Sequence, residues 1–420
     1  MRNRNFFWII VSILVLLDLY IYQVIKVVSH SASHRTRLIL FTCYWTISGA
    51  AILLLALMPA LNVEKWGKAT RAYVFAVLLG LFFAKFIAVV FFLIDDIRRL
   101  LQWAAGKLFF ARTEADALNS GGISRSIFLS WVGLIAGGGL FGTLVYGFKN
   151  KYNYEVRRLK LSFSNLPPAF KGLKIVQISD IHSGSFTNKE AVAKGVVKIM
   201  EEKPDLILFT GDLVNDMAIE MHDYMDVFNK LSAPMGVFST LGNHDYGDYH
   251  WGHSPVGEKA IEKANSLKRL KEIHGEMGWR LLMDEHVPLE RGGQQIALIG
   301  VQNISAKARF FTYGDMKKAY EGTEKYPFKI LMSHDPSHWD GEVRPKYPDV
   351  DLMLAGHTHG MQFGIEIPGF KWSPVQYVYK QWAGLYEEGK QKLYVNRGYG
   401  FIGYPGRVGI MPEITVFELV

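Results

Sequence analysis

Five short motifs in the second half of the chain combine carboxylate, imidazole and amide side chains. In chain order they are Asp180-Ile181-His182, Gly211-Asp212, Gly242-Asn243-His244-Asp245, His334, and Gly356-His357-Thr358-His359. Oxygen and imidazole donors of this kind suit divalent cations such as Mn, Fe or Zn, and the sequence does not choose among them. The motifs therefore predict a site for two divalent cations.

Each motif follows a short apolar run that is typical of a buried β-strand. The runs cover residues 174–180, 205–212, 235–245, 329–335 and 350–356, and helical spacing is found over 188–203, 221–233 and 258–277. Buried strands that alternate with helices predict an α/β sheet with helices on its faces. Open sheets of this class bind ligands at the carboxyl ends of their strands, so we expect the five motifs at one edge.

Each motif also has an ordinary structural explanation when it is taken alone. Asp-Ile-His can form a turn, Gly-Asp is a common loop pair, and Asn-His-Asp can cap a helix. The five motifs in this order, each after an apolar strand, make coincidence the weaker explanation.

With these motifs in order, residues 155–420 resemble the calcineurin-like metallophosphoesterases. The resemblance is strongest to the membrane-associated bacterial branch of YkuE-like and YaeI-like proteins, and it extends through residues 166–183 and 394–419. It implies an α/β fold of two packed mixed sheets flanked by helices, the four-layer αββα sandwich of the family. It also implies that the chain is an enzyme, a metal-dependent phosphoric ester hydrolase.

The resemblance further implies a ligand set for two divalent metal ions. One ion would be held by Asp180, His182, Asp212 and His359, and the other by Asp212, Asn243, His334 and His357. Asp212 would bridge the two, and a hydroxide between them would attack phosphorus in line with the leaving oxygen. His244 is the expected general acid or transition-state donor.

Two side chains are candidates for binding the substrate. Asn243 is one, and Arg407 is the other because a guanidinium binds phosphate through two hydrogen bonds; a purely structural Arg407 is an equal alternative. Two positions depart from the family pattern. Asn215 stands where many relatives have an Asp that orients the catalytic His, and Met361 stands where close relatives have Gly.

The first third of the chain reads as a membrane region. Apolar runs cover 6–28, 38–61, 72–94 and 127–148, and each has the roughly 20 residues needed to cross a hydrocarbon core of about 30 Å. Asp18 and Lys85 interrupt these runs at matching depth, so we expect them to pair inside the bundle; the alternative is that each faces a polar cavity alone. Residues 95–125 mix basic and apolar side chains, which predicts an amphipathic connection on the membrane surface.

The predicted domains are therefore a four-helix transmembrane region over 1–148, with an amphipathic loop at 95–125, and a metallophosphoesterase domain over 149–420. The net charge of +8 falls entirely in residues 1–148, while residues 149–420 hold 33 basic and 33 acidic residues. The catalytic part thus lacks the basic footprint of a nucleic-acid partner.

Charge counts leave the membrane orientation open, with ten basic residues near one side and eight near the other. Residues 124–129 resemble a degenerate twin-arginine export signal, which favours an extracytoplasmic catalytic domain of a multi-pass cell-membrane protein. The oligomeric state is not indicated.

The expected function is a membrane-anchored dinuclear-metal phosphoesterase that acts on a phosphoester or pyrophosphate bond of a lipid-linked or envelope substrate. One alternative is a UDP-2,3-diacylglucosamine pyrophosphatase of lipid A synthesis, which requires a cytoplasmic domain. An alternative of another class is a membrane sensor or transporter whose phosphoesterase domain binds without hydrolysis. Aromatic segments at 246–257 and 361–385 are expected to form a lid or to contact acyl chains of the substrate; the alternative is that their aromatic residues belong to the core.

Overall fold

The computed structural model describes residues 4–109 and 125–420. Its internal contacts divide the chain into a helical unit that ends at Tyr146 and an α/β unit that begins at Gly147. Each unit is described by itself below.

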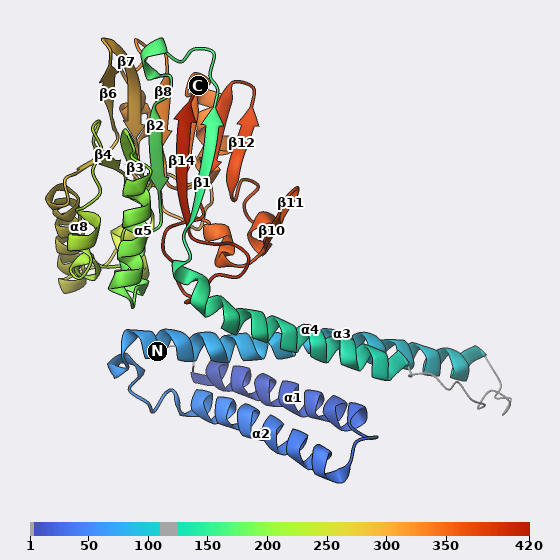
Figure 1. Ribbon diagram of the computed structural model, residues 1–420. Helices are drawn as coiled ribbons and strands as arrows, with labels where there is room; N and C mark the ends of the chain where they lie inside the picture. Colours follow the sequence, from blue (N-terminus) through green and yellow to red (C-terminus); the bar gives the residue numbers. More distant parts are fainter. Residues whose placement is uncertain (1–3, 110–124) are drawn as a thin grey trace. The chain divides into compact units, whose positions relative to one another are not determined.

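The helical unit consists of long apolar helices (Figure 1). They are α1 (Arg4–Val28), α2 (His34–Leu57), α3 (Lys68–Phe109) and α4 (Arg125–Gly147). Within the described residues, all four are long and apolar enough to cross a membrane. The prediction of four membrane-crossing helices is confirmed.

Helix α3 is much longer than a single crossing requires. Its 42 residues span about 63 Å at 1.5 Å per residue, so the expected separate connection beginning at residue 95 is wrong. Asp95 pairs with Arg98 one turn later at 2.7 Å, which supports the helix at the point where the connection was expected to begin. The rest of the expected amphipathic connection, residues 110–124, lies outside the described residues.

The two charges within the apolar helices meet inside the helical unit. Lys85 Nζ lies 2.5 Å from Asp18 Oδ1 and donates to Ser48 Oγ at 2.8 Å. The Tyr44 hydroxyl donates to the same Asp18 oxygen at 2.6 Å. The expected pairing is confirmed, and it ties α1, α2 and α3 together through one buried polar cluster.

Helices α3 and α4 approach closely because small residues face each other. A side chain at Gly137 would come within 2.5 Å of the Ala84 carbonyl oxygen, and one at Gly133 within 2.9 Å of that of Ala88. Such small-residue seams are the usual means by which membrane helices pack without a hydrophobic driving force.

The α/β unit contains two six-stranded sheets and a small hairpin, all in the fully described range 147–420. The first sheet has the order β1 (Glu155–Leu161), β14 (Glu413–Leu419), β2 (Lys174–Ile178), β3 (Leu206–Phe209), β4 (Val237–Ser239) and β5 (Trp279–Leu281). The second has the order β12 (Gly384–Glu388), β13 (Gln391–Val395), β9 (Leu352–Ala355), β8 (Lys329–Met332), β7 (Gln294–Gly300) and β6 (Glu285–Arg291). The hairpin pairs β10 (Ile365–Ile367) with β11 (Phe370–Trp372).

The sheets pack face to face and carry helices on their outer faces. Ile175 and Leu208 of the first sheet and Ile330 and Leu354 of the second belong to one buried core between them. Alternate strand residues point outward, where α5 (Lys189–Glu201) and α8 (Glu258–Glu276) cover the first sheet (Figure 1). The second sheet shares its outer core with α9 (Met316–Tyr320) and a π-helical turn, Trp339–Val343. The predicted αββα sandwich is confirmed.

Two sequence-based expectations about the elements need correction. The helix expected over 221–233 is reduced to α6 (Met225–Phe228), because the backbone leaves helical geometry at Tyr224. The five motifs also do not come from one sheet. Strands β2, β3 and β4 run parallel in the first sheet, and β7, β8 and β9 run parallel in the second. The motifs thus follow strands of both sheets.

Candidate metal centre

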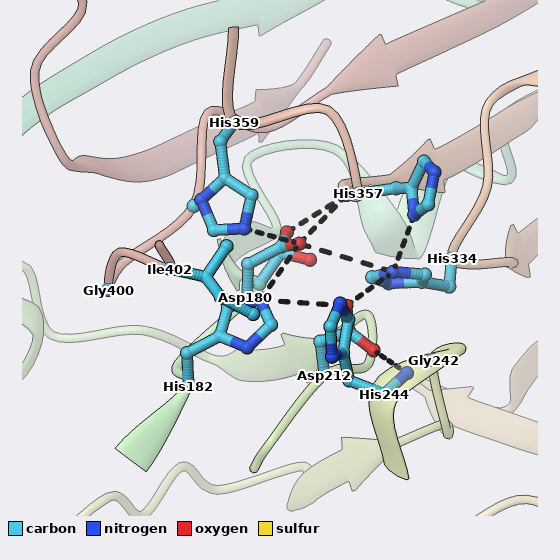
Figure 2. Close-up of polar contacts among 12 residues, drawn as sticks. Asp180, His182, Asp212, Gly242, His244, His334, His357, His359, Gly400 and Ile402 are labelled. Atoms are coloured by element: carbon cyan, nitrogen blue, oxygen red, sulfur yellow. Dashed lines mark hydrogen bonds and ion pairs between the residues drawn. The ribbon is translucent and has the colours of Figure 1, made fainter. Parts of the chain in front are cut away.

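Six predicted metal ligands converge as two adjacent groups of three (Figure 2). Asp180, His182 and His359 form one group, and Asp212, His334 and His357 form the other; within each group the donor atoms lie within 4.8 Å of one another. His359 Nε2 is 3.3 Å from Asp180 Oδ1, and His334 Nε2 is 3.0 Å from Asp212 Oδ2.

Asp212 lies between the groups. Its Oδ2 atom is 3.6 Å from His182 Nε2 in the first group and 3.0 Å from His334 Nε2 in the second. This is the position that the bridging role requires.

Five of these residues adopt left-handed backbone conformations that residues other than glycine rarely take. They are Asp180, His182, Asp212, His357 and His359, with φ between 49° and 73°. Such conformations cost roughly 1–3 kcal/mol each and persist where the surroundings fix them, commonly at functional sites. Here the two loops fix each other, since Asp180 N donates to Gly211 O at 2.9 Å and His182 N to Asp212 O at 3.2 Å.

Two motif glycines are required by close approach to the carboxylates. A Cβ atom at Gly242 would collide with the carboxylate of Asp212, and one at Gly356 would collide with that of Asp180. The glycines thus let the loops after β4 and β9 close over the donor atoms.

Neighbouring groups orient two of the imidazoles. His334 Nδ1 lies 2.7 Å from the carbonyl oxygen of Thr210, which can only accept, so Nε2 is left free to face the carboxylates. His357 Nε2 lies 2.8 Å from the Tyr379 hydroxyl, which in turn donates to Asp335 Oδ2 at 3.2 Å. His357 therefore presents Nδ1 to its group.

Several donor atoms at this site are buried without a hydrogen-bond partner. They are both ring nitrogens of His182, Nε2 of His359 and Oδ1 of Asn243. Unsatisfied buried polar atoms are costly and rare. The lone pairs of one His182 nitrogen, of His359 Nε2 and of Asn243 Oδ1, together with the two carboxylates, fit divalent cations. Asn243 would add its oxygen to the group that contains His334.

Three of the ligands are in their metal-binding form near neutral pH. Burial lowers the pKa of His182 to about 3 and that of His357 to about 4, so both imidazoles are neutral. Burial alone would raise the pKa of Asp212, but the neighbouring His334 and His244 hold it well below its usual range. Metal ligands must be deprotonated to bind, and these three groups meet that condition. His334 does not, because its contact with Asp212 outweighs burial and raises its pKa to about 10, so a cation must displace its proton.

His244 is held by the backbone. Its Nδ1 atom lies 2.7 Å from the carbonyl oxygen of Asn215, and its backbone N donates to Asp212 Oδ1 at 2.8 Å. The carbonyl fixes the proton on Nδ1 and leaves Nε2 for the cavity. The side chain of Asn215 instead bonds Ser185, so its replacement of Asp leaves the orientation of His244 intact.

The comparisons with known proteins agree with this geometry. Residues 2–151 match the family "Probable Calcineurin-like phosphoesterase, transmembrane domain", and residues 173–361 match "Calcineurin-like phosphoesterase". The chain is 31% identical over 315 residues to the uncharacterized metallophosphoesterase YkuE of Bacillus subtilis, covering 71% of this chain and 98% of that protein. The chain is a calcineurin-like metallophosphoesterase.

Two further relatives of this metallophosphoesterase have named activities. It is 30% identical over 274 residues to the phosphodiesterase YaeI of Escherichia coli, covering 64% of this chain and 88% of that protein. It is 28% identical over 280 residues to the UDP-2,3-diacylglucosamine pyrophosphatase LpxG of Chlamydia muridarum, covering 58% and 81%. The matched transmembrane family and the four apolar helices found among the described residues make it a membrane protein.

Arg407 of the metallophosphoesterase is a structural residue in this structure. Its side chain is fully buried and donates to backbone oxygens of Arg397 at 2.8 Å, Gly398 at 3.2 Å and His359 at 3.3 Å, and also to that of Gly400. The prediction that Arg407 binds phosphate is therefore corrected. Its guanidinium is already hydrogen-bonded to the backbone of two loops, the one that carries His359 and the one between β13 and β14.

A cavity of about 520 Å³ opens onto the metal ligands. Besides His182, Asp212, Asn243, His244, His357 and His359, its lining comprises Tyr249, Arg309, Phe310, Thr358, Val375, Tyr379 and Ile402. Tyr249, Val375 and Tyr379 fall in the two predicted aromatic segments. Arg309, Phe310 and Ile402 belong to no predicted motif or aromatic segment.

Arg309 is the cation that the cavity offers in place of Arg407. It follows β7, an unpredicted strand whose carboxyl end lies at the same end of its sheet as those of β8 and β9. Its guanidinium lies 4.6 Å from the ring centre of Phe310 and 6.0 Å from that of Tyr379. The strand-end rule applied to β7 would have found it.

Proposed function

We propose that this metallophosphoesterase consists of a membrane anchor over 1–148 and a hydrolase over 149–420 that cleaves a phosphodiester or pyrophosphate bond with two divalent metal ions. The observation that carries the proposal is the convergence of six predicted ligands, Asp180, His182, Asp212, His334, His357 and His359. The ring nitrogens of His182 and Nε2 of His359 have no hydrogen-bond partner. Asn243 Oδ1 supplies a further donor at the cavity wall.

Two bound cations would neutralise phosphate charge and activate a water for attack on phosphorus. The residues of the chain supply the rest. Asp212 draws the two groups of ligands together, and Thr358 and Tyr379 shape the cavity wall. His244, with its tautomer fixed by Asn215, is placed to give a proton to the leaving oxygen.

The test is hydrolysis of bis-para-nitrophenyl phosphate by the full-length protein in detergent with added Mn²⁺. We expect activity in the wild type, loss of activity on chelation, and a rate lower by roughly 10²–10⁴ in His244→Ala. Equal rates in the wild type, Asp212→Ala and His244→Ala would contradict the proposal and favour a domain that binds without hydrolysis. Comparing para-nitrophenyl phosphate separates monoesterase from diesterase activity.

The substrate proposed is lipid-linked or part of the cell envelope. The tether to a membrane and the apolar part of the cavity wall, Phe310, Val375 and Ile402, support this choice. The similarity to LpxG favours UDP-2,3-diacylglucosamine as the second candidate.

The two substrates differ in the side of the membrane on which they are presented. An envelope substrate fits the extracytoplasmic orientation that we propose, whereas the nucleotide-linked one requires a cytoplasmic domain. Alkaline phosphatase and green fluorescent protein fused at Val420 distinguish them. Active phosphatase supports the envelope substrate, and fluorescence supports the nucleotide-linked one.

A further inference from the structure

The hairpin β10–β11 carries an apolar face that is exposed. Ile365 pairs with Trp372 and Ile367 with Phe370, so these four side chains share one face. Ile365, Ile367 and Phe370 are 49%, 58% and 53% exposed. In an antiparallel pair that lies on a protein in water, this face would be expected to cover the core.

The polar face of the hairpin points toward the domain. Glu366 accepts hydrogen bonds from Arg157 at 2.8 and 2.9 Å and from Arg397 at 2.7 and 3.1 Å. Lys371 donates to the carbonyl oxygen of Ala383 at 2.5 Å. Because these contacts hold the polar face inward, the outward position of the apolar face is fixed by the fold.

Three exposed apolar side chains flank the hairpin in the chain. Met361 precedes it, and Tyr377 and Val378 follow it. Met361 also has a φ of 54°, where glycine would be unstrained. Together with Ile365, Ile367 and Phe370, they form what we call the 361–378 surface. Apolar patches of this kind mark contact with a partner or a membrane.

Residues 362–364, where this surface begins, are linked by hydrogen bonds through residues 407–408 to residues 147–150, at the end of the last membrane span. The candidate span extends over Arg125–Tyr152. Arg407 N donates to Gly147 O at 3.0 Å, and Asn150 Nδ2 donates to Arg407 O at 3.1 Å. The next residue, Val408, pairs with the segment just before β10. Its N donates to Gln362 O at 2.8 Å, and its O accepts from Gly364 N at 2.9 Å. The apolar environment nearest to the 361–378 surface along the chain is therefore the bilayer that the last span is expected to cross.

We propose that the 361–378 surface docks on the lipid bilayer and inserts Ile365, Ile367 and Phe370 below the headgroups. Trp372 and Tyr377 suit the boundary, because indole and phenol rings combine an apolar body with a polar edge. A short helical turn, Pro374–Tyr377, and then Tyr379 follow β11. Val375 and Tyr379 line the catalytic cavity, so the docked hairpin places the mouth of the cavity at the lipid surface.

Docking itself does not depend on catalysis, whereas delivery of a lipid-linked substrate to the cavity rests on the proposed function. The test uses the full-length protein in nanodiscs of phosphatidylcholine and phosphatidylglycerol. Cys43→Ser removes the single native cysteine, and Ile367→Cys is then labelled with a nitrobenzoxadiazole fluorophore. Ile365→Cys is the second labelled site. The control is Val256→Cys, which is 85% exposed and lies outside the surface.

We expect the fluorophore at 367 and 365 to emit at shorter wavelength than at 256, and to be quenched by lipids that carry a shallow doxyl group. Water-like emission at 367 and 365, unquenched by lipid, would overturn the proposal. Emission shifted to shorter wavelength but unquenched by lipid would overturn it as well, because protein would then cover the surface.

Hydrolysis of the water-soluble bis-para-nitrophenyl phosphate is measured on the same samples. Quenching without hydrolysis would leave the docking proposal standing and refute the proposed function. Hydrolysis without quenching would do the reverse.

Discussion

His244 is held in place by a backbone carbonyl rather than by a carboxylate. An amide side chain at Asn215 cannot support an imidazolium by charge, as the Asp of many relatives does. The structure gives that task to the carbonyl oxygen of Asn215, 2.7 Å from Nδ1. A side-chain pattern could not reveal this, since every residue type carries the same carbonyl.

We expect Asn215→Ala to leave the kcat for bis-para-nitrophenyl phosphate within about threefold of the wild type, because the carbonyl remains. His244→Ala should lower kcat by roughly 10²–10⁴. Steady-state kinetics of the two variants at saturating Mn²⁺ check this. A loss in Asn215→Ala as large as that in His244→Ala would show that the Asn215 side chain orients the imidazole.

Arg309 is expected to bind the substrate phosphate or its substituents at the cavity wall. Arg309→Met should raise KM about tenfold with little change in kcat, since it removes one charge-assisted hydrogen bond. Lys307→Met is the matched control. Lys307 lies on the same loop, 5.4 Å from the Tyr379 ring centre, but it does not line the cavity. Equal effects of both variants would indicate general charge attraction instead.

At the scale of the elements, the site residues were predicted from their motifs more completely than the strands that surround them. The runs at 174–180, 205–212, 329–335 and 350–356 contain β2, β3, β8 and β9, because buried parallel strands are continuously apolar. Strands β6 and β7 carry no motif and were not predicted, although β7 leads to Arg309. The prediction of a helix over 221–233 was wrong for a different reason. The apolar residues at helical spacing lie in a short, irregular connection instead.

Helix α8 contains a buried histidine that makes stability depend on pH. Burial lowers the pKa of His274 to about 3, and its Nδ1 bonds Ser239 Oγ at 2.9 Å. Unfolding returns the pKa to about 6.5, so between these values the unfolded state binds the extra proton and stability falls as pH falls. The contribution is fully present above about pH 6.5.

We expect acidification from pH 7 to pH 5 to lower the unfolding temperature of the catalytic unit, and His274→Leu to flatten that dependence. Thermal unfolding followed by tryptophan fluorescence checks it. His222→Leu is the control, because that side chain is 78% exposed. An equal slope in the wild type and in His274→Leu would contradict the assignment.

In the helical unit, the Asp18–Lys85 pair should be visible as a coupling. Removing one charge of a buried pair typically costs about 3–5 kcal/mol, because it leaves the other unpaired. We expect Asp18→Lys and Lys85→Asp each to lower the unfolding temperature in detergent, and the double swap to recover most of the loss. Additive losses in the double variant would mean that the two charges do not stabilise each other.

At the scale of the whole molecule, the sequence predicted a membrane region and an α/β hydrolase from opposite signals. Long apolar runs predicted four membrane helices, and polar residues at strand ends predicted the metal centre. The continuation of α3 to Phe109 and the inward-facing polar side of the β10–β11 hairpin were not predicted. The orientation of the hairpin depends on the tertiary pairing of Glu366 with Arg157 and Arg397, which local patterns do not encode.

The central proposal is that two metal ions perform the hydrolysis. One is held by Asp180, His182 and His359, and the other by Asp212, His334 and His357. The direct measurement is a titration of metal-stripped, full-length protein with Mn²⁺, with bound metal and bis-para-nitrophenyl phosphate hydrolysis recorded on the same samples. We predict that activity rises with occupancy to two Mn²⁺ per chain, and that Asp212→Asn loses both binding and activity. Hydrolysis that persists in the stripped protein, or that is unchanged in Asp212→Asn, would contradict the account.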